Sequence, residues 1–294
     1  MKNALYLAFA ILFLSACQKN EPGTDSIDGS KNSNVLQEVA PTTFTQKLLV
    51  EMYSSAVCAT CPDAMQKFLN YESQYPGRVI GADIHTFDPM DVPMYDTLDN
   101  LLNITAFSSG SFNRLPYNGS AVIHKTEWSS SNIVNTTLQK TAKCGLKINT
   151  TITGNNADIS VACAFNTNLT GDYRLTVYLT EDSVTGSASG YNQSNYYNNT
   201  PSSPFYQLGN PIVGYYHRDV LRKVLTSGKG KSITNGGAVT KGAIIQNNFT
   251  TSISGYNSSR LTVIAFINKV GSTATTHEIL NAQKVKLGKN QNWD

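Results

Sequence analysis

The sequence predicts an α+β protein, with an N-terminal α/β domain followed by an antiparallel β-sandwich domain. A Cys-x-x-Cys pair stands between an apolar, strand-like run and a helix-like segment within residues 47–75. From about residue 143, apolar residues recur at every second position in several short runs, which is typical of antiparallel strands. We therefore expect four regions: a signal segment (1–17), a tether (18–42), the α/β domain (43–140) and the sandwich (141–290).

The first 17 residues have the parts of a secretory signal. Lys2 supplies a positive charge, the run from Ala4 to Leu14 is apolar, and small residues precede Cys17. The run is shorter than the roughly 20 residues of a membrane-spanning helix. Leu14-Ser15-Ala16-Cys17 resembles the lipobox of bacterial lipoproteins, in which the cysteine is acylated and becomes the new N-terminus. A lipid anchor on Cys17 is therefore expected; an ordinary secretory signal with a chance cysteine is the alternative.

Residues 18–42 are polar and rich in Gly, Pro, Ser and Asn. Such a segment buries too little apolar surface to offset the entropy of ordering, so a flexible tether is expected. Its reach is on the order of 25–30 Å. Gln18 stands where an inner-membrane retention signal would place Asp, so the outer membrane is favoured, with the side that the chain faces left open.

Composition excludes one class of partner and allows disulfides. Only 15 % of the residues are charged, the net charge is +3, and no basic cluster stands out, so a nucleic-acid partner is not expected. With Cys17 acylated, four cysteines remain in an oxidising compartment: Cys58, Cys61, Cys144 and Cys163. Asp88 and Asp91 are explained by a proline-containing loop, so neither a metal nor another cofactor is expected.

The chemistry concentrates at Cys58 and Cys61. The apolar run from Leu48 to Tyr53 predicts a buried strand, a small-residue turn follows, and Met65 and Phe68 share one face of a helix after the pair. Cys58 would lie at the helix N-terminus, where free N–H groups and the helix dipole stabilise a thiolate. This context predicts a thioredoxin-like redox pair, with the Cys58 sulfur exposed and the Cys61 sulfur buried; a structural disulfide is the alternative.

Three further residues are candidates for the same site. Residues 78–85 predict a second strand, and if it is parallel to the first, Asp83 and His85 border the dithiol at the carboxyl edge of the sheet. Glu51 is the acid candidate ahead of the dithiol. Pro116 precedes a predicted strand at 120–124, where thioredoxin-like proteins place a cis-proline that faces the dithiol. The predicted catalytic set is Cys58, Cys61, Glu51, His85 and Pro116.

Four stretches resemble the Omp28-related outer-membrane lipoproteins of Bacteroidetes. They are the lipobox, Val50-Glu51, Cys58-Ala59-Thr60-Cys61-Pro62 and the segment from Tyr215 to Arg222. The resemblance implies a thioredoxin-like domain followed by a β-sandwich at the outer membrane, in a family discussed as surface receptors or adhesins. Two departures from efficient thioredoxins weaken the case for general reductase activity. Val57 replaces a tryptophan, and Glu51 lies one residue further upstream than their acid.

The second half predicts at least six strands. Apolar residues alternate along 144–152, 159–165 and 173–179, and later runs cover 244–253, 261–268 and 278–287. In a hairpin that turns near Asn155, Cys144 and Cys163 are expected about four residues out of register, on the order of 13 Å apart. Two buried thiols are therefore expected in place of a disulfide.

Residues 183–213 are rich in Tyr, Asn, Ser and Gly, a composition that gives binding loops rigid aromatic contacts and adaptable hydrogen bonds. The alternative is a loop whose aromatic residues only cover the sandwich core. The predicted binding residues are Tyr191, Tyr196, Tyr197, Phe205 and Tyr206.

Two functions follow from these patterns. The first is a surface or periplasmic binding protein of adhesin type, with a protein or glycan partner and a thioredoxin-like scaffold. The second is a membrane-tethered thiol–disulfide oxidoreductase that uses Cys58 and Cys61. The aromatic loop and Val57 favour the first, and the intact Cys-x-x-Cys favours the second.

The lipobox generates a direct prediction. Cys17→Ser removes the acylated thiol, so the protein should move from the membrane fraction to the soluble periplasm, because lipid is the only expected anchor. Fractionation followed by immunoblotting checks this. Cys144→Ser, which leaves the lipobox intact, should remain with the membrane. Unchanged membrane association of Cys17→Ser would contradict the lipoprotein assignment.

Overall fold

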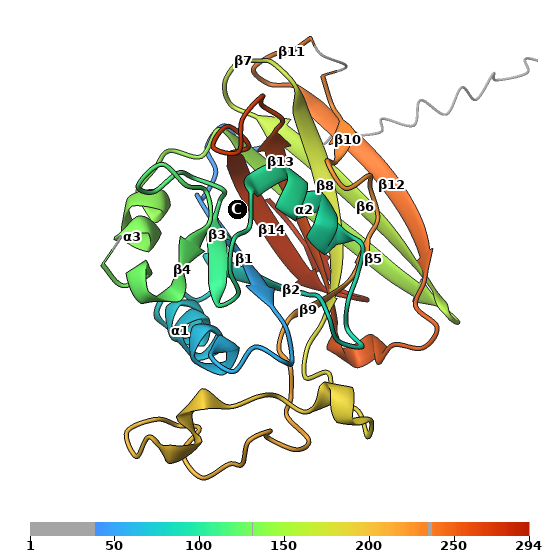
Figure 1. The fold of residues 1–294 in the computed structure, drawn as a ribbon. Coiled ribbons are helices and arrows are strands. Elements are labelled where there is room, and N and C mark those ends of the chain that lie inside the picture. Colours follow the sequence, from blue (N-terminus) through green and yellow to red (C-terminus); the bar gives the residue numbers. More distant parts are fainter. Residues whose placement is uncertain (1–38, 131, 235–236, 294) are drawn as a thin grey trace, which may run out of the picture. The chain divides into compact units, whose positions relative to one another are not determined.

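A sheet of nine strands runs through the protein (Figure 1). The computed structural model describes residues 39–130, 132–234 and 237–293, so the predicted signal segment and almost all of the tether lie outside the described residues. The strands in sheet order are β14 (Ile279–Lys286), β13 (Leu261–Lys269), β8 (Tyr173–Glu181), β9 (Val220–Val224), β2 (Val79–His85), β1 (Leu48–Ser54), β3 (Ser109–Phe112) and β4 (Ile123–His124), with β10 (Lys231–Ser232) paired to β8.

The described part of the chain starts with a β–α–β unit in which β1 and β2 are parallel, which meets the condition set in the sequence analysis for Asp83 and His85. The helix α1 (Cys61–Gln74) connects them, and every residue of both strands is buried. Strands covered on both faces are apolar along their whole length, which explains why β1 shows no alternation. Three elements that the sequence analysis did not identify follow: α2 (Met94–Leu102), β3, which is antiparallel to β1, and α3 (Ile133–Leu138).

Helix α1 packs closely on β2 because β2 has a glycine at the contact. A Cβ atom added to Gly81 would lie 2.2 Å from the Phe68 ring. Met65 and Phe68 are buried on this helix face, as predicted, and Asp63 lies in the first turn, where the helix dipole favours a negative charge. Because side chains alternate along a strand, Asp83 faces the same side of the sheet as Gly81, toward the start of α1.

The second half forms the predicted antiparallel strands. The strands β5 (Cys144–Thr153), β6 (Asn156–Phe165), β12 (Ile244–Ser252) and β15 (Asn290–Gln291) form a four-stranded sheet. Its inner face packs against β8, β13 and β14 around Leu146, Val161, Val177, Val263 and other apolar residues. The remaining elements are short: β7 (Leu169–Thr170), β11 (Ala238–Val239) and 3-10 helices at Lys125–Glu127, Ser189–Tyr191, Tyr196–Asn199 and Ser258–Arg260. The elements agree with the predicted α+β class.

The β5–β6 hairpin corrects one predicted register. Cys144 pairs with Phe165 and Cys163 pairs with Leu146, so the two cysteines are offset by two residues and not by four. The hairpin pairs Thr153 with Asn156, and the register counted back from this tight turn gives the smaller offset. Both thiols are free and fully buried, as predicted. Burial raises the pKa of Cys163 to about 12, so this thiol stays protonated and unreactive.

The two halves of the chain share one continuous sheet. Strands β8, β9, β13 and β14 extend the sheet that β1 to β4 begin. The sheet also brings β14 against the start of β1, where the backbone N–H of Lys47 donates to Asn281 Oδ1 (2.9 Å) and that of Ile279 donates to the Asn113 carbonyl (2.8 Å). Independent folding of residues 43–140 and 141–290 stays a prediction.

A buried ion pair joins the halves inside this sheet. Arg114 donates to both carboxylate oxygens of Glu51, at 2.7 and 2.6 Å, and both side chains are excluded from solvent. Tyr178 of β8 donates a third hydrogen bond to Glu51 (2.9 Å), and the Arg114 guanidinium lies 5.4 Å from the centre of the Phe266 ring in β13. Burial by itself would raise the pKa of Glu51, but Arg114 and the hydrogen bonds lower it below its ordinary value.

We expect Arg114→Met to destabilise the protein by about 3–5 kcal/mol, because it leaves the Glu51 carboxylate buried without a cation. The double variant with Glu51→Gln should recover much of this loss, since the buried charge is removed. Urea unfolding gives the free energies. Arg174→Met is the control: Arg174 forms a partly exposed pair with Asp172 (2.7 Å), so its loss should cost at most about 1 kcal/mol. Equal losses for the two arginines would contradict a structural role of the buried pair.

Candidate functional site

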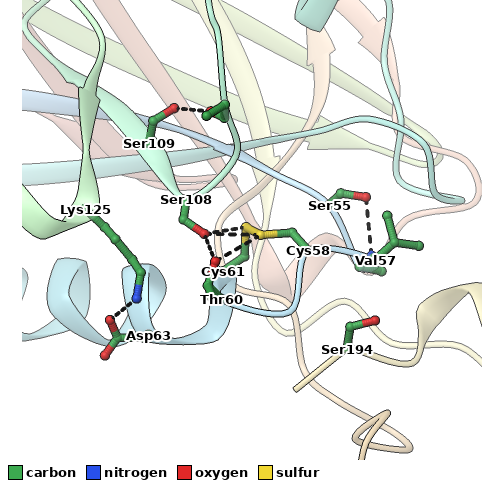
Figure 2. The surroundings of a disulfide bond; sticks show 12 residues. Ser55, Val57, Cys58, Thr60, Cys61, Asp63, Ser108, Ser109, Lys125 and Ser194 are labelled. Carbon is green, nitrogen blue, oxygen red and sulfur yellow. Dashed lines mark hydrogen bonds and ion pairs between the residues drawn. A yellow bond between two sulfur atoms is a disulfide. The ribbon is translucent and has the colours of Figure 1, made fainter. Parts of the chain in front are cut away.

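Cys58 and Cys61 form a disulfide at the start of α1, with their Cα atoms 5.5 Å apart (Figure 2). The backbone builds this turn by itself, since the N–H of Cys58 donates to the Ser55 carbonyl (3.0 Å) and the N–H of Cys61 donates to the Cys58 carbonyl (3.2 Å). Cys58 is 8 % exposed and Cys61 is 5 % exposed. The expectation of an exposed Cys58 sulfur is therefore corrected: both residues are buried.

Ser108 is the residue that contacts the sulfur atoms. Its hydroxyl oxygen lies 3.2 Å from Cys58 Sγ and 3.5 Å from Cys61 Sγ, and 2.6 Å from the Thr60 hydroxyl (Figure 2). Ser108 has a positive φ of 58°, which turns the chain into β3 and aims the hydroxyl at the disulfide. Sequence reasoning missed this residue because β3 consists of Ser-Gly-Ser-Phe, which carries no alternating apolar pattern.

Pro116 does not face the dithiol. Strand β3 runs from Ser109, paired with Tyr53 near the disulfide, to Phe112, paired with Val50, so Pro116 follows the end of β3 that points away from the sulfurs. It is exposed, and its peptide bond is trans, because the cis peptide bond in the described part of the chain is Asn210–Pro211.

Glu51 also lies away from the dithiol. Its neighbours along β1, Val50 and Met52, pack with α1 and α3, so the Glu51 side chain points to the other face of the sheet. Arg114 and Tyr178 already bind its two oxygens. Glu51 is thus part of a buried ion pair on the opposite face of the sheet from the sulfur atoms.

His85 lies on the α1 face at the end of β2 and binds two carboxylates. Its Nδ1 is 2.6 Å from Asp88 Oδ2 and its Nε2 is 3.1 Å from Asp83 Oδ2, with His85 fully buried. Asp88 Oδ2 also accepts the backbone N–H of Ala56 (2.7 Å), two residues before Cys58. The cluster therefore fixes the turn that carries the disulfide.

The charges of this cluster follow from its geometry. Burial alone would lower the pKa of His85, but Asp83 and Asp88 raise it to about 9, so His85 is a cation at neutral pH. The ring of His217 packs edge-on against that of His85, with 5.1 Å between centres. Burial and the His85 charge lower the pKa of His217 to about 4, so His217 is neutral. Among the described residues, no group of three or more His, Cys, Asp or Glu side chains is arranged to hold a metal ion.

A long connection between β8 and β9, residues 183–217 and here called the strap, extends beyond the sheet (yellow in Figure 1). Its two arms pair with each other: Val184 and His217 exchange backbone hydrogen bonds at 2.8 and 2.9 Å, and Gln193 and Ile212 do so at 3.1 and 2.7 Å. The buried Asn195 amide donates to two strap carbonyls, each at 2.9 Å. These bonds give the strap a defined shape without a regular helix or long strand.

The strap covers the disulfide turn through backbone hydrogen bonds. The N–H of Ser194 donates to the Ala56 carbonyl (2.8 Å). The side chain of Gln193, which is 2 % exposed, donates to the carbonyls of Cys58 (2.8 Å) and Ala56 (3.1 Å). These contacts explain the burial of Cys58.

A second set of contacts holds the next residues of the strap. The N–H of Tyr196 donates to the Ala59 carbonyl (2.9 Å). The Lys125 ammonium donates to the hydroxyl of Tyr197 and to the carboxylate of Asp63 in the first turn of α1, each at 2.5 Å. Reagents that reach Cys58 must therefore displace the strap or enter beneath it.

Of the five predicted binding residues, three make contacts inside the protein and two are exposed to solvent. Phe205 is buried, Tyr191 packs with Ala56 and Met90, and Tyr197 holds Lys125. Tyr196, at 70 % exposure, and Tyr206, at 37 %, present their rings to solvent. Three further strap residues that the sequence analysis did not single out are exposed apolar or aromatic side chains: Leu208, Val213 and Tyr216.

Fold and site together define an α+β protein with a buried Cys-x-x-Cys disulfide at a helix start. The family described as "Outer membrane protein Omp28" matches residues 95–291, more than half of the chain, and the chain belongs to this family. This places the protein at the outer membrane. The matched range begins after β2, so the family match does not include Cys58 and Cys61. No helix in the described residues has the length and apolar character to span a bilayer.

Two solved structures are similar to this one. HBP35 of Porphyromonas gingivalis is 17 % identical with a TM-score of 0.64, and the match covers 84 % of this chain and 77 % of that chain. A protein of Agrobacterium tumefaciens is 11 % identical with a TM-score of 0.50, covering 85 % and 98 % of the two chains. At these identities the likeness shows a shared fold alone. A comparison with curated proteins finds no match.

We expect Gln193→Ala to speed reduction of the Cys58–Cys61 disulfide by dithiothreitol roughly ten-fold. The substitution removes hydrogen bonds that hold the strap on the turn, and a loss of about 1.4 kcal/mol in strap closure corresponds to that factor. Maleimide labelling and mass spectrometry follow the reaction. Gln207→Ala, at an exposed strap position whose side chain contacts only the Tyr206 hydroxyl, should leave the rate unchanged. Equal rates for the two variants would show that the strap does not shield the disulfide.

Proposed function

We propose that this Omp28-family protein is a lipid-anchored outer-membrane thiol–disulfide protein that binds partner proteins at the strap. The observation that carries the proposal is the Cys58–Cys61 disulfide at the N-terminus of α1, with the Ser108 hydroxyl against both sulfurs. A structural disulfide would require neither the helix N-terminus nor a hydroxyl placed against both sulfur atoms.

The order of elements supports a thioredoxin-like assignment for residues 43–140. The chain runs β1-α1-β2-α2-β3-β4-α3, and the corresponding strands lie in the order β2-β1-β3-β4. A Cys-x-x-Cys pair that opens the helix of a βαβ unit is the arrangement of a thioredoxin-like redox motif. Ser108, just before β3, faces the disulfide as the sequence analysis expected of Pro116 before the predicted strand at 120–124.

The proposed reaction is thiol–disulfide exchange. A partner thiolate attacks Cys58 Sγ, the Cys58–Cys61 bond breaks, and Cys61 leaves as the thiolate and takes up a proton; two electrons pass from partner to protein when a second partner thiol resolves the mixed disulfide. In the reverse direction Cys58 attacks a partner disulfide and Cys61 resolves it. The N–H groups at the start of α1 favour a negative charge on Cys58.

A binding role without redox chemistry is the second candidate, and the surface of the strap favours it. Tyr196, Tyr206, Leu208, Val213 and Tyr216 expose aromatic and apolar side chains on one segment, next to the disulfide turn. Aromatic side chains with polar neighbours are typical of binding surfaces. In this adhesin-type role the disulfide only holds the turn that supports the strap.

Lipid anchoring is part of the proposal. The Leu14-Ser15-Ala16-Cys17 lipobox and the polar segment after it support acylation at Cys17, and the family places the protein at the outer membrane. The resemblance to outer-membrane lipoproteins of Bacteroidetes supports the same reading. Anchoring would hold the strap and the dithiol within reach of other envelope proteins.

Trapping of mixed disulfides tests the redox function. In Cys61→Ser the resolving thiol is absent, so Cys58 should remain bonded to partner proteins, whereas Cys58→Ser should trap few or none. Non-reducing gels of envelope fractions show the adducts. Tyr196→Ser in the Cys61→Ser background should lower their yield several-fold if the strap binds the partners. Ile152→Ser, which changes an exposed apolar side chain on β5 outside the strap, is the control.

The outcomes separate the two functions. No adducts with either cysteine variant, together with equal alkylation rates at both thiols and pKa values near that of a free thiol, would leave the disulfide a structural element. Partner proteins recovered with a Cys58→Ser/Cys61→Ser variant, and lost on Tyr196→Ser, would then support binding alone.

A further inference from the structure

Beneath the first turn of α1 lies a small space that both Cys61 and Asp83 line. It has a volume of about 10 Å³ and is also lined by Met52, Tyr53, Ser109 and neighbouring residues. A cavity needs roughly 10–15 Å³ to hold one water molecule. Cys61 and Asp83 therefore line one space of about the size of a water molecule.

One oxygen of Asp83 has no hydrogen-bond partner. Oδ2 binds His85 at 3.1 Å, but Oδ1 is buried and accepts no hydrogen bond, and Asp83 as a whole is 4 % exposed. Leaving a buried acceptor unsatisfied costs about 1–3 kcal/mol, more for a charged group. Reduction of the disulfide would create a hydrogen-bond donor near this oxygen, the Cys61 thiol.

The contact with His85 holds the Asp83 side chain in place. His85 lies between Asp83 and Asp88, and the pKa of His85, raised to about 9, makes it the cation of the cluster at neutral pH. The neutral His217 and Tyr215 face the cluster from the strap, and burial raises the pKa of Tyr215 beyond the neutral range. Asp219, directly before β9, accepts the Asp83 N–H with its backbone carbonyl (2.9 Å).

We propose that Asp83 is the proton acceptor and donor for the Cys61 thiol. When the protein is reduced, the Cys61 S–H donates to Asp83 Oδ1. When Cys61 attacks the mixed disulfide at Cys58, its proton passes to Asp83 Oδ1, the Cys61–Cys58 bond forms, and the partner sulfur leaves as a thiolate. In the opposite direction the proton returns to the Cys61 thiolate as it leaves. This inference rests on the proposed thiol–disulfide function.

The structure assigns this role to β2 and not to β1. Glu51, the acid that the sequence analysis favoured, points to the other face of the sheet and is neutralised by Arg114. Asp83 faces α1, because Gly81, two residues earlier on the same strand, contacts Phe68 of that helix.

Stopped-flow reaction of the reduced full-length protein with Ellman's reagent tests the proposal. Attack by Cys58 releases the first thionitrobenzoate, and resolution by Cys61 releases the second. Asp83→Asn should leave the first phase within about two-fold and slow the second at least about ten-fold at pH 6.5, since a positioned general base contributes 10²–10⁴-fold. The deficit should shrink toward pH 8.5, where solvent deprotonates a thiol. Asp91→Asn, on the adjacent loop, makes the same chemical change outside the cavity and should leave both phases unaltered.

Each outcome bears on one claim. A normal first phase with equal second phases in Asp83→Asn and the unaltered protein overturns the role of Asp83 alone. Absence of both phases in the unaltered protein overturns the thiol–disulfide function and the inference with it. Redox-difference infrared spectroscopy of the unaltered protein needs no variant and covers the case in which Asp83→Asn fails to fold. A buried carboxylate band should shift on reduction, together with the S–H band of a hydrogen-bonded thiol, and unchanged carboxylate bands overturn the proposal.

Discussion

The arrangement of the protein depends on the buried contact of Glu51 with Arg114 and Tyr178. Glu51 comes from the strand that leads to the disulfide, Arg114 follows β3, and Tyr178 belongs to β8, in the half of the chain that packs against the four-stranded sheet. Two charges in a dry interior are tolerable only as a well-bonded pair. The pair itself lies in the first half, and the Tyr178 hydroxyl of the second half binds Glu51 only when the two halves meet in one register. The dithiol unit is thus built into a larger sheet.

On the other face of that sheet, a second buried set of charges determines what the disulfide meets. Asp83, His85 and Asp88 form a row from the cavity under Cys61 to the backbone of Ala56. The strap reaches the same place through His217 at its base and Gln193 in its first arm. The disulfide therefore lies between the Asp83–His85–Asp88 cluster and the strap. The strap controls access to the sulfur atoms, and the proposed proton transfer uses the cluster.

Strong local patterns in the sequence predicted β1, α1, β2 and the six long strands of the second half. The apolar runs and the Cys-x-x-Cys pair involve only residues that are close in sequence, so they can be recognised without knowledge of the tertiary structure. Ser108 and Gln193 could not be predicted, because each acts through contacts with residues 50 and 135 positions away, and neither lies in a periodic segment. Pro116 was chosen because it precedes a predicted strand, and Glu51 because it is the acid ahead of the dithiol. The strand direction and the side-chain alternation place both away from the sulfurs.

The contact of β14 with the start of β1 has a kinetic consequence. Lys47 binds Asn281 and Gln283, more than 230 residues further along the chain. Strand β9 follows the strap in sequence and lies between β2 and β8 in the sheet. Contacts between such distant residues form slowly, because a long chain must first be brought together. The sheet is complete only when the last strands have arrived, so the chain stays incompletely folded until almost all of it has been synthesised. For a chain that crosses a membrane before folding, this delay is an advantage.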